Sequence, residues 1–257
     1  MTPEPTVGVV HVHSNYSHDG KDALERVRDL AVARGVRFVA MSDHAEDFDA
    51  SRFEAFVAHC DAVTRPDVSI IPGLEFRFAG YRGLHLIALG LRRWIAPRTP
   101  GEFAATAPEA SGLTVVAHPG LARYTIPPEV AATIDAIEVW NAAYNTRYLP
   151  DPKAIRVLRA MRRTRPAVVG VAGLDQHDAA NDRRTRVVLA RQTADPLAEL
   201  RGGRFENRGA TLTFDAHGDW PAAALVALSV ARTGLDVIER TQERWARARR
   251  GRRRVDG

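Results

Sequence analysis

Seven of the nine histidines in this 257-residue chain lie at or near the ends of short apolar runs, where carboxylates also occur. These histidines and carboxylates are His11, His13, His18, His44, His85, His118, His177, Asp43, Glu75 and Asp175. Imidazole nitrogens and carboxylate oxygens are ligands for divalent transition metals. One such position is weak evidence, but their recurrence at strand after strand predicts a polynuclear metal site. We expect His59 and His217 to be non-ligands.

The local spacing of these residues supports metal binding. His11 and His13 are two apart on a predicted strand, so their side chains share a face and can chelate one ion. Asp175 and His177 repeat that spacing. A carboxylate such as Glu75 can bridge two ions, and two ions about 3.5–4 Å apart can activate water and neutralise a phosphoryl oxygen.

Apolar runs alternate with segments of helical period, which predicts βα units and a parallel sheet. Gly35 is expected to end the first helix. Loops that follow parallel strands lie at the carboxyl edge of the sheet, and at least six strand ends carry candidate ligands, so a closed or nearly closed barrel is favoured over an open sheet. We expect strands near 7–13, 36–42, 68–75, 82–91, 113–118, 134–140 and 167–174, helices near 21–34, 51–63 and 152–163, and a loop or short helix over 99–109.

The last quarter of the chain differs, because it offers no obvious ligands. We expect strands over 185–190 and 209–214 and a long helix over 220–250 that serves packing or association. Residues 239–257 contain eight arginines and three acidic residues, a balance that accounts for the whole net charge of +5. This basic tail could contact nucleic acid, but a solvated helix terminus is the favoured interpretation.

Composition limits the remaining classes. The single cysteine, Cys60, excludes an internal disulfide framework and makes a thiolate zinc site implausible. The N-terminus lacks the pattern of a secretory signal, and no apolar stretch is long enough to span a membrane. A cytoplasmic location is therefore the default expectation. The sequence gives no oligomeric state.

The ordered set His-x-His, Ser-Asp-His, Gly-x-Glu, His, Ala-His-Pro and Asp-x-His resembles the polymerase and histidinol phosphatase (PHP) superfamily of metal-dependent phosphoesterases. The resemblance covers roughly residues 7–208. It implies a distorted (β/α)7 TIM-like barrel, here with a C-terminal helical extension, so that residues 1–214 form the metallophosphoesterase domain and 215–257 a helix and basic tail.

The resemblance also implies roles for the candidate ligands. One metal site consists of His11, His13, Glu75 and Asp175; Glu75 bridges to a second metal held by His85 and His118; and His18, His44 and His177 hold a third. Many relatives carry Asp at the position of His18, and Asp19 is adjacent.

The implied reaction is attack on phosphorus by a metal-bound hydroxide. Asp43 is the candidate catalytic residue, either orienting an imidazole or moving a proton, with orientation favoured. Arg123 and Arg77 are candidate phosphate ligands because guanidinium binds phosphate bidentately, and Asn141 is a candidate for the substrate pocket. For Arg123, an ordinary surface arginine is an equally good interpretation.

Three functional hypotheses follow. The leading one is a phosphomonoesterase that hydrolyses a small phosphorylated metabolite such as histidinol phosphate or a nucleotide. The second is a nuclease or oligonucleotide phosphatase that uses the basic tail, and the third is a non-catalytic metal-binding interaction module. Mixed imidazole and carboxylate ligands suit Zn, Mn or Fe, so the sequence predicts two or three divalent ions without choosing among these metals.

Overall fold

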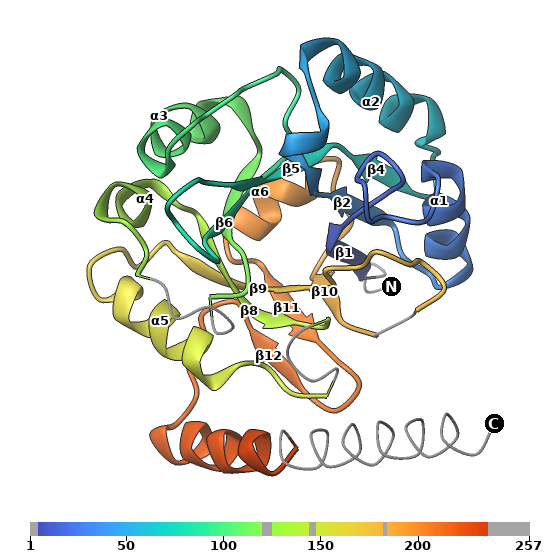
Figure 1. Cartoon of the computed structure of the whole chain (residues 1–257). Coiled ribbons are helices and arrows are strands. Elements are labelled where there is room, and N and C mark those ends of the chain that lie inside the picture. The colour runs from blue at the N-terminus through green and yellow to red at the C-terminus, as the bar shows by residue number, and fades with distance from the viewer. Residues whose placement is uncertain (1–4, 120–124, 144–147, 182–183, 236–257) are drawn as a thin grey trace, which may run out of the picture. The chain divides into compact units, whose positions relative to one another are not determined.

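The computed structural model describes residues 5–119, 125–143, 148–181 and 184–235. Its strands form two six-stranded sheets, which makes the fold mixed α/β (Figure 1). The first sheet has the order β12 (Thr213–Asp215), β11 (Phe205–Arg208), β10 (Arg186–Leu189), β1 (Thr6–Val12), β2 (Phe38–Met41) and β4 (Ser69–Ile71). The second has the order β3 (Asp43–His44), β5 (Gly73–Arg77), β6 (His85–Leu89), β7 (Leu113–Val116), β8 (Ala136–Asn141) and β9 (Val169–Gly173).

The chain passes from the first sheet to the second at two single residues. Ser42 separates β2 from β3, and Pro72 separates β4 from β5. On the other side, the segment after β9 reaches β1, where Leu174 N donates to Val10 O at 2.9 Å and His13 N to Gln176 O at 2.9 Å. These contacts adjoin the two sheets, but no single closed sheet joins the described strands, so the predicted barrel is confirmed only as a mixed α/β fold.

Helices connect the strands, and α1 to α5 lie outside them (Figure 1). Most begin at a polar cap whose side chain accepts a backbone N–H, namely Asp49, Thr99, Asp151 and Asp195. The predicted end of the first helix at Gly35 is confirmed, with φ +68° at that residue. The helices are α1 (Leu24–Ala33), α2 (Ala50–Val63), α3 (Pro100–Ala110), α4 (Pro128–Thr133), α5 (Pro152–Arg162), α6 (Pro196–Arg201) and the 3-10 turn η1 (Ala45–Asp47).

The main apolar core lies among the strands and includes Leu197 and Leu200 of α6. Two of its members immediately precede predicted ligands, because Val10 precedes His11 and Ala117 precedes His118. Burying one such aliphatic side chain stabilises the fold by roughly 1.5–3 kcal/mol. The strand ends that carry ligands are therefore anchored by the best-packed part of the domain.

Several sequence-based expectations need correction. The sheet is not all parallel, because β6 runs antiparallel to both β5 and β7 and β10 runs antiparallel to β1. The predicted strand over 209–214 is wrong for its first half: Gly209 N donates to Leu212 O at 2.8 Å and closes a hairpin between β11 and β12. For residues 99–109, predicted as a loop or short helix, the helical alternative is confirmed by α3. The short helices α4 and α6 were not predicted, because six residues show little periodicity.

A second compact unit begins at Trp220, beyond the first unit of residues 1–219. Its described part is helical from 222 to 235, within the predicted long helix. The basic tail after Glu239 lies outside the described residues. No helix in the described ranges combines the length and apolar character needed to cross a membrane.

Candidate metal centre

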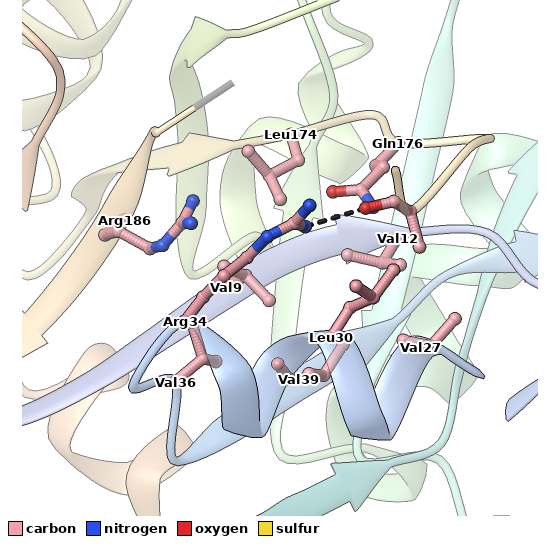
Figure 2. A pocket seen from close by; sticks show the side chains of 12 residues that line it. Val9, Val12, Val27, Leu30, Arg34, Val36, Val39, Leu174, Gln176 and Arg186 are labelled. Carbon is pink, nitrogen blue, oxygen red and sulfur yellow. Dashed lines mark hydrogen bonds between the residues drawn. The ribbon is translucent and has the colours of Figure 1, made fainter. Parts of the chain in front are cut away.

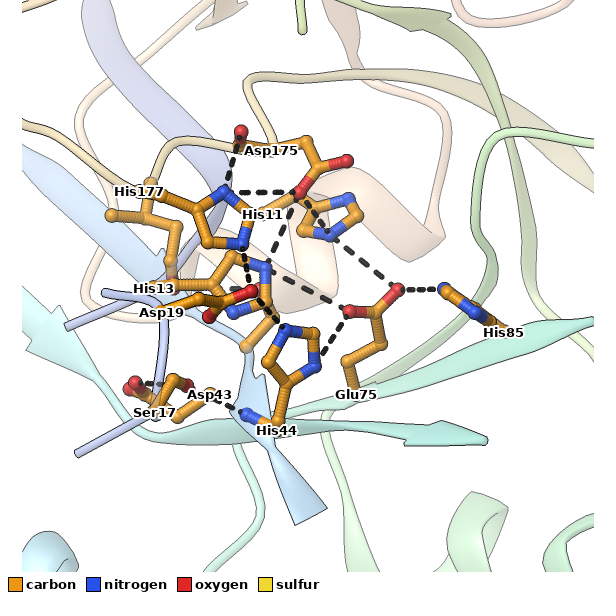
Figure 3. Close-up of polar contacts among 12 residues, drawn as sticks. His11, His13, Ser17, Asp19, Asp43, His44, Glu75, His85, Asp175 and His177 are labelled. Carbon is orange, nitrogen blue, oxygen red and sulfur yellow. Dashed lines mark hydrogen bonds and ion pairs between the residues drawn. The ribbon is translucent and has the colours of Figure 1, made fainter. Parts of the chain in front are cut away.

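The carboxylate of Glu75 lies among five imidazoles and is almost fully buried. Figure 3 labels four of them, on His11, His13, His44 and His85. One oxygen, Oε1, is 2.8 Å from Nδ1 of His85, 3.3 Å from Nε2 of His118 and 3.7 Å from Nε2 of His11. The other, Oε2, is 3.2 Å from Nδ1 of His44 and 3.7 Å from Nε2 of His13. A carboxylate in this position can contribute an oxygen to more than one ion.

Three groups of side chains place their ligand atoms close enough together to hold an ion. They are His11, Glu75 and His118; His11, His13 and Asp175; and His13, Asp19, His44 and His177. The first two groups are buried, whereas the third includes the exposed Asp19 and the half-buried His177. Residues from separate loops and strand ends thus converge at one place.

Several buried imidazole nitrogens in this cluster lack a hydrogen-bond partner. Within the described residues, this is true of Nε2 of His11, both ring nitrogens of His13 and Nδ1 of His44. A buried polar atom without a partner costs roughly 1–3 kcal/mol, so four in one cluster require an explanation. A divalent transition metal would pair with one nitrogen of each of these rings, because neutral imidazole and carboxylate are its ligands. The residues present therefore fit the expected metals.

His85 reaches the cluster because β6 runs against its neighbours. It is the first residue of β6 and pairs with Arg77, the last residue of β5. The first residue of an antiparallel strand lies at the same edge as the last residues of the strands beside it. A parallel β6 would not explain why its first residue, His85, lies at the edge that carries the other ligands.

Three of the candidate ligands have an unusual backbone conformation, which sets the direction of their side chains. His11, His118 and Asp175 have φ values of +64°, +32° and +48°, in the region that non-glycine residues rarely adopt. At His11 the pairing of β1 with β2 shifts register between Val10 and Val12, as at a β-bulge. Simple alternation along a regular strand therefore does not explain how His11 and His13 meet, although their ring centroids are 5.3 Å apart.

Glu138 is a buried carboxylate that sequence analysis missed. Its Oε1 accepts from Nδ1 of His11 at 2.9 Å, and its Oε2 accepts from the backbone N of His118 at 2.7 Å and from Nδ2 of Asn141 at 3.0 Å. A Cβ at position 173 would force Oε1 of Glu138 to move, so glycine at this position preserves these contacts. The signal in the sequence was an acidic residue inside the apolar strand Ala136–Asn141.

Through these contacts, Glu138 and Asn141 orient candidate metal ligands. By accepting from Nδ1 of His11, the carboxylate leaves Nε2 of that ring facing Glu75 and Asp175, the ring orientation that a metal ligand needs. Asn141, predicted as a substrate residue, is fully buried and also donates to Asp175 Oδ2 at 3.2 Å. The structure therefore places Asn141 among the supports of the ligands.

Asp43, the predicted catalytic residue, is fully buried and holds the turn that follows β1. Its Oδ1 accepts from the backbone N of Ser14 at 2.8 Å and from Oγ of Ser17 at 2.8 Å (Figure 3). Ser17 Oγ in turn accepts from the backbone N of His44 at 2.8 Å. Burial raises the pKa of Asp43 to about 6, although the hydrogen bonds from Ser14 and Ser17 oppose the shift.

The turn at 17–20 presents Asp19 rather than His18 to the cluster. Asp19 Oδ2 is 3.3 Å from Nε2 of His44 and 3.3 Å from Nε2 of His177. His18 instead pairs with Asp47 through Nδ1 at 2.8 Å, and its side chain is 55% exposed. The predicted ligand group was His18, His44 and His177. The side chains whose ligand atoms lie close together are instead those of His13, Asp19, His44 and His177.

For the buried histidines, burial lowers the pKa and neighbouring carboxylates raise it, so the net shift differs from one residue to the next. Burial lowers the pKa of His13 to about 4. Burial acts the same way on His11, but the carboxylates of Glu138 and Asp175 outweigh it and raise the pKa of His11 well above 6.5. Burial alone would raise the pKa of Glu75, yet the imidazoles that surround its carboxylate hold that pKa well below its ordinary value.

Arg77 lies at the rim of the cluster. Its Nη2 donates to Nε2 of His44 at 3.2 Å, its Nη1 is 3.4 Å from Oε1 of Glu46, and its side chain is 44% exposed. A guanidinium that is both exposed and in contact with a candidate ligand can receive an anion from solvent. Arg123, the other predicted phosphate ligand, lies outside the described residues.

The loop after β9, which carries His177, is fastened to α1 and to the turn before it. Arg34 donates to Ala179 O at 2.7 Å, Asp22 accepts from Ala179 N at 2.6 Å, and Lys21 N donates to His177 O at 2.9 Å. Figure 2 shows the Arg34 side chain at a cavity between α1 and the sheet. That cavity, at about 20 Å³, holds about one water molecule and is too small for a substrate.

The two remaining histidines lie apart from the three ligand groups. His59 Nε2 is 2.8 Å from Oε1 of Glu25, and its Nδ1 is 3.2 Å from the hydroxyl of Tyr16. His217 lies in the turn after β12, where its backbone N donates to Asp215 Oδ1 at 2.7 Å.

Comparison with known proteins identifies the family. A family model described as PHP domain matches residues 10–197. The chain belongs to the PHP domain family. It is therefore a metal-dependent hydrolase that acts on phosphate ester bonds, as the resemblance implied, and the hypothesis of a non-catalytic module falls. No curated protein matches the sequence.

Solved structures resemble the PHP chain in fold at low sequence identity. PsfC from Pseudomonas syringae PB-5123 has a TM-score of 0.54 and 20% identity, over 90% of this chain and 99% of PsfC. An amidohydrolase from Chromobacterium violaceum with bound sulfate and no metal has a TM-score of 0.50 and 14% identity, over 77% of this chain and 96% of its own. A proposed metal-dependent phosphoesterase from Bifidobacterium adolescentis has a TM-score of 0.49 and 14% identity, over 68% and 89% of the two chains.

Proposed function

We propose that this PHP protein is a phosphomonoesterase that hydrolyses a small phosphorylated metabolite, such as histidinol phosphate or a nucleotide. The observation that carries the proposal is the carboxylate of Glu75 among five imidazoles, beside a rim that is open at Arg77. The closely spaced donor groups suit more than one divalent ion. We also propose that the two adjoining sheets act as a distorted (β/α)7 barrel and that residues 1–214 form the catalytic domain.

The proposed ligand sets follow the geometry. His11, His13, Glu75 and Asp175 would hold one ion, Glu75 with His85 and His118 a second, and His44 and His177 a third, with Asp19 in place of the predicted His18. Two or three ions of Zn, Mn or Fe are compatible with these donors. When bound, such ions lower the pKa of water and neutralise charge on phosphoryl oxygens.

The protein's own residues then bind and orient. Arg77 is proposed to hold a phosphoryl oxygen at the rim, where its guanidinium is within reach of solvent. Glu138 fixes the proton on Nδ1 of His11 and so keeps Nε2 directed at the ligand group. Asp43 is proposed to be a positioning residue and not to carry a proton itself. It fixes the turn that presents Asp19.

The decisive experiment combines metal analysis with a substrate screen. The purified protein is loaded separately with Zn, Mn or Fe, its metal content is measured by elemental analysis, and hydrolysis of a broad panel of phosphomonoesters is followed by phosphate release. We expect turnover of at least one class of phosphomonoester. Folded, metal-replete protein that hydrolyses none of them would refute the proposal.

The nuclease alternative is tested on the same preparation. Hydrolysis of short RNA or DNA, with no turnover of phosphomonoesters, would favour that alternative. A variant that lacks residues 247–257 then tests the basic tail, because this deletion removes six of the eight arginines that follow Glu239. Unchanged activity of this variant on oligonucleotides would exclude a role for the tail.

A further inference from the structure

An open cleft lies at the rim of the metal centre, beside Arg77. Its volume is about 510 Å³, within the range of about 300–1,000 Å³ that small-molecule sites occupy. Its lining residues come from η1, from the end of β5 and from the segment before α3. The lining residues that matter for binding are Ala45, Glu46, Arg77, Ala79, Trp94 and Arg98.

The cleft is continuous with the metal centre in both sequence and contacts. Ala45 and Glu46 directly follow the candidate ligand His44. Arg77 contributes to both places, because it lines the cleft and its Nη2 is 3.2 Å from Nε2 of His44. A phosphate ester held by Arg77 at the metal centre therefore has this cleft available for the group attached to the phosphate.

The lining is mainly apolar and contains one aromatic residue that is only partly buried. Eight of the eleven lining residues are apolar, and Trp94 is half-buried, with its ring 5.7 Å from that of Phe53. An indole face beside an apolar cleft stacks well on a flat ring. This lining fits a ring better than it fits a polyol, whose hydroxyl groups would lose water without gaining hydrogen bonds.

The charged lining residues leave a net positive charge. Glu46 pairs with Arg77 at 3.4 Å, so the remaining charged side chain of the lining is Arg98. Arg98 is exposed and belongs to the segment before α3, a different part of the lining from Arg77. A ligand that occupies the cleft can therefore meet a second cation away from the phosphate.

We propose that this cleft binds the leaving group of the substrate, and that the leaving group is a ring-containing apolar body with a second anionic group. The proposal rests on the proposed phosphomonoesterase function and narrows its substrate class. Trp94 contacts the ring, and Arg98 pairs with the anionic group.

Binding of phosphonates tests the cleft without relying on turnover. Dissociation constants of methylphosphonate, phenylphosphonate and 4-carboxyphenylphosphonate are measured by calorimetry on the metal-replete protein. We expect phenylphosphonate to bind about 10-fold more tightly than methylphosphonate, equivalent to about 1.4 kcal/mol, and the carboxylated ligand to bind more tightly again. Equal affinity for the three ligands would overturn the proposal.

Three variants assign the selectivity to residues, with a fourth as control. Trp94→Ala should remove the preference for the phenyl group, and Arg98→Ala should remove only the gain from the carboxylate. Ala79→Leu, which narrows the cleft, should weaken the binding of phenylphosphonate and leave the binding of methylphosphonate unchanged. This variant replaces the Trp94 variant in the test if the latter does not fold. Arg93→Ala changes a neighbouring exposed arginine that does not line the cleft and should alter none of the constants.

Parallel assays of phenyl phosphate hydrolysis separate the two proposals. Turnover of phenyl phosphate with no selectivity among the phosphonates would overturn the cleft assignment and leave the proposed function standing. Selective phosphonate binding with no hydrolysis of any phosphomonoester would overturn the proposed function. Selectivity that persists in both the Trp94 and the Arg98 variants would place the leaving group elsewhere.

Discussion

The metal centre has a buried half and an exposed rim, and different forces hold the two. His11, Glu75 and Asp175 lie in or beside strands, and each is at most 4% exposed. At the rim, the side chains of Asp19 and His18 are 40% and 55% exposed and lie on a turn. The buried ligands are fixed by sheet packing and by Glu138, whereas the rim depends on hydrogen bonds from one turn to Asp43. The two halves should therefore respond differently to mutation.

Replacing Glu75 should have the largest effect, because this one side chain contacts imidazoles of both halves. Glu75→Gln keeps the size of the side chain but removes its negative charge. We expect a loss of about 10³-fold or more in kcat/KM, since metal-mediated charge stabilisation provides several kcal/mol. Metal content should fall in the same preparation, as elemental analysis will show. Glu54→Gln, on the exposed face of α2, is the matched control and should leave both unchanged.

Replacing Glu138 should weaken only the buried half. The carboxylate accepts from three donors, on His11, His118 and Asn141. In Glu138→Gln, the amide nitrogen cannot accept, so at least one of these contacts becomes a donor facing a donor. We expect metal affinity to fall about 10–100-fold, as measured by competition with a chromophoric chelator. An unchanged affinity would show that the orientation of His11 does not depend on this carboxylate.

At the rim, the test compares the metal affinity of variants at two adjacent residues, Asp19 and His18. Asp19→Ala removes an oxygen that lies 3.3 Å from both His44 and His177, and we expect it to lower the affinity of the rim metal about 10-fold. His18→Ala removes a side chain that pairs with Asp47, and metal content should stay at the wild-type level. Loss of metal in the His18 variant alone would reverse this assignment.

The buried half of the site could be predicted from sequence because strands impose a strict order. A His or carboxylate that follows an apolar run is expected at or just beyond the end of a strand. His118 and Asp175 do lie just after β7 and β9, whereas Glu75 lies within β5. The same rule cannot choose between His18 and Asp19. A polar turn has no periodicity, and the choice depends on hydrogen bonds from Ser14 and Ser17 to Asp43, which is distant in sequence.

The fold was predictable to a similar depth. Strands and helices with clear periodicity were found within a few residues, as for α2 and β7. The antiparallel direction of β6 was not, because an apolar run such as His85–Leu89 reads the same in either direction. Glu138 was missed for a related reason: its role depends on donors from β1 and from the segment after β7, which are distant in sequence, as well as on Asn141 in its own strand.

The smallest predicted effect concerns stability at the rim. Asp43→Ala leaves buried donors on Ser14 and Ser17 unpaired, at a cost of about 1–3 kcal/mol each in the free energy of unfolding. Asp43→Asn retains an acceptor oxygen and should cost less. The measurement is denaturant unfolding of the metal-free proteins.

The pH dependence of the Asp43→Asn variant isolates the charge of this carboxylate. Because burial raises the pKa of Asp43 from 3.8 to about 6, the folded state binds its proton more tightly than the unfolded state does. The unfolding free energy of the wild type, relative to the variant, should therefore fall as pH rises from about 4 to about 6, and then stay constant. Other ionisable groups are common to both proteins and cancel in the difference. Parallel curves across this window would mean that Asp43 holds the turn as an ordinary ionised acceptor, and the rim would then owe its geometry to hydrogen bonding without a cost from buried charge.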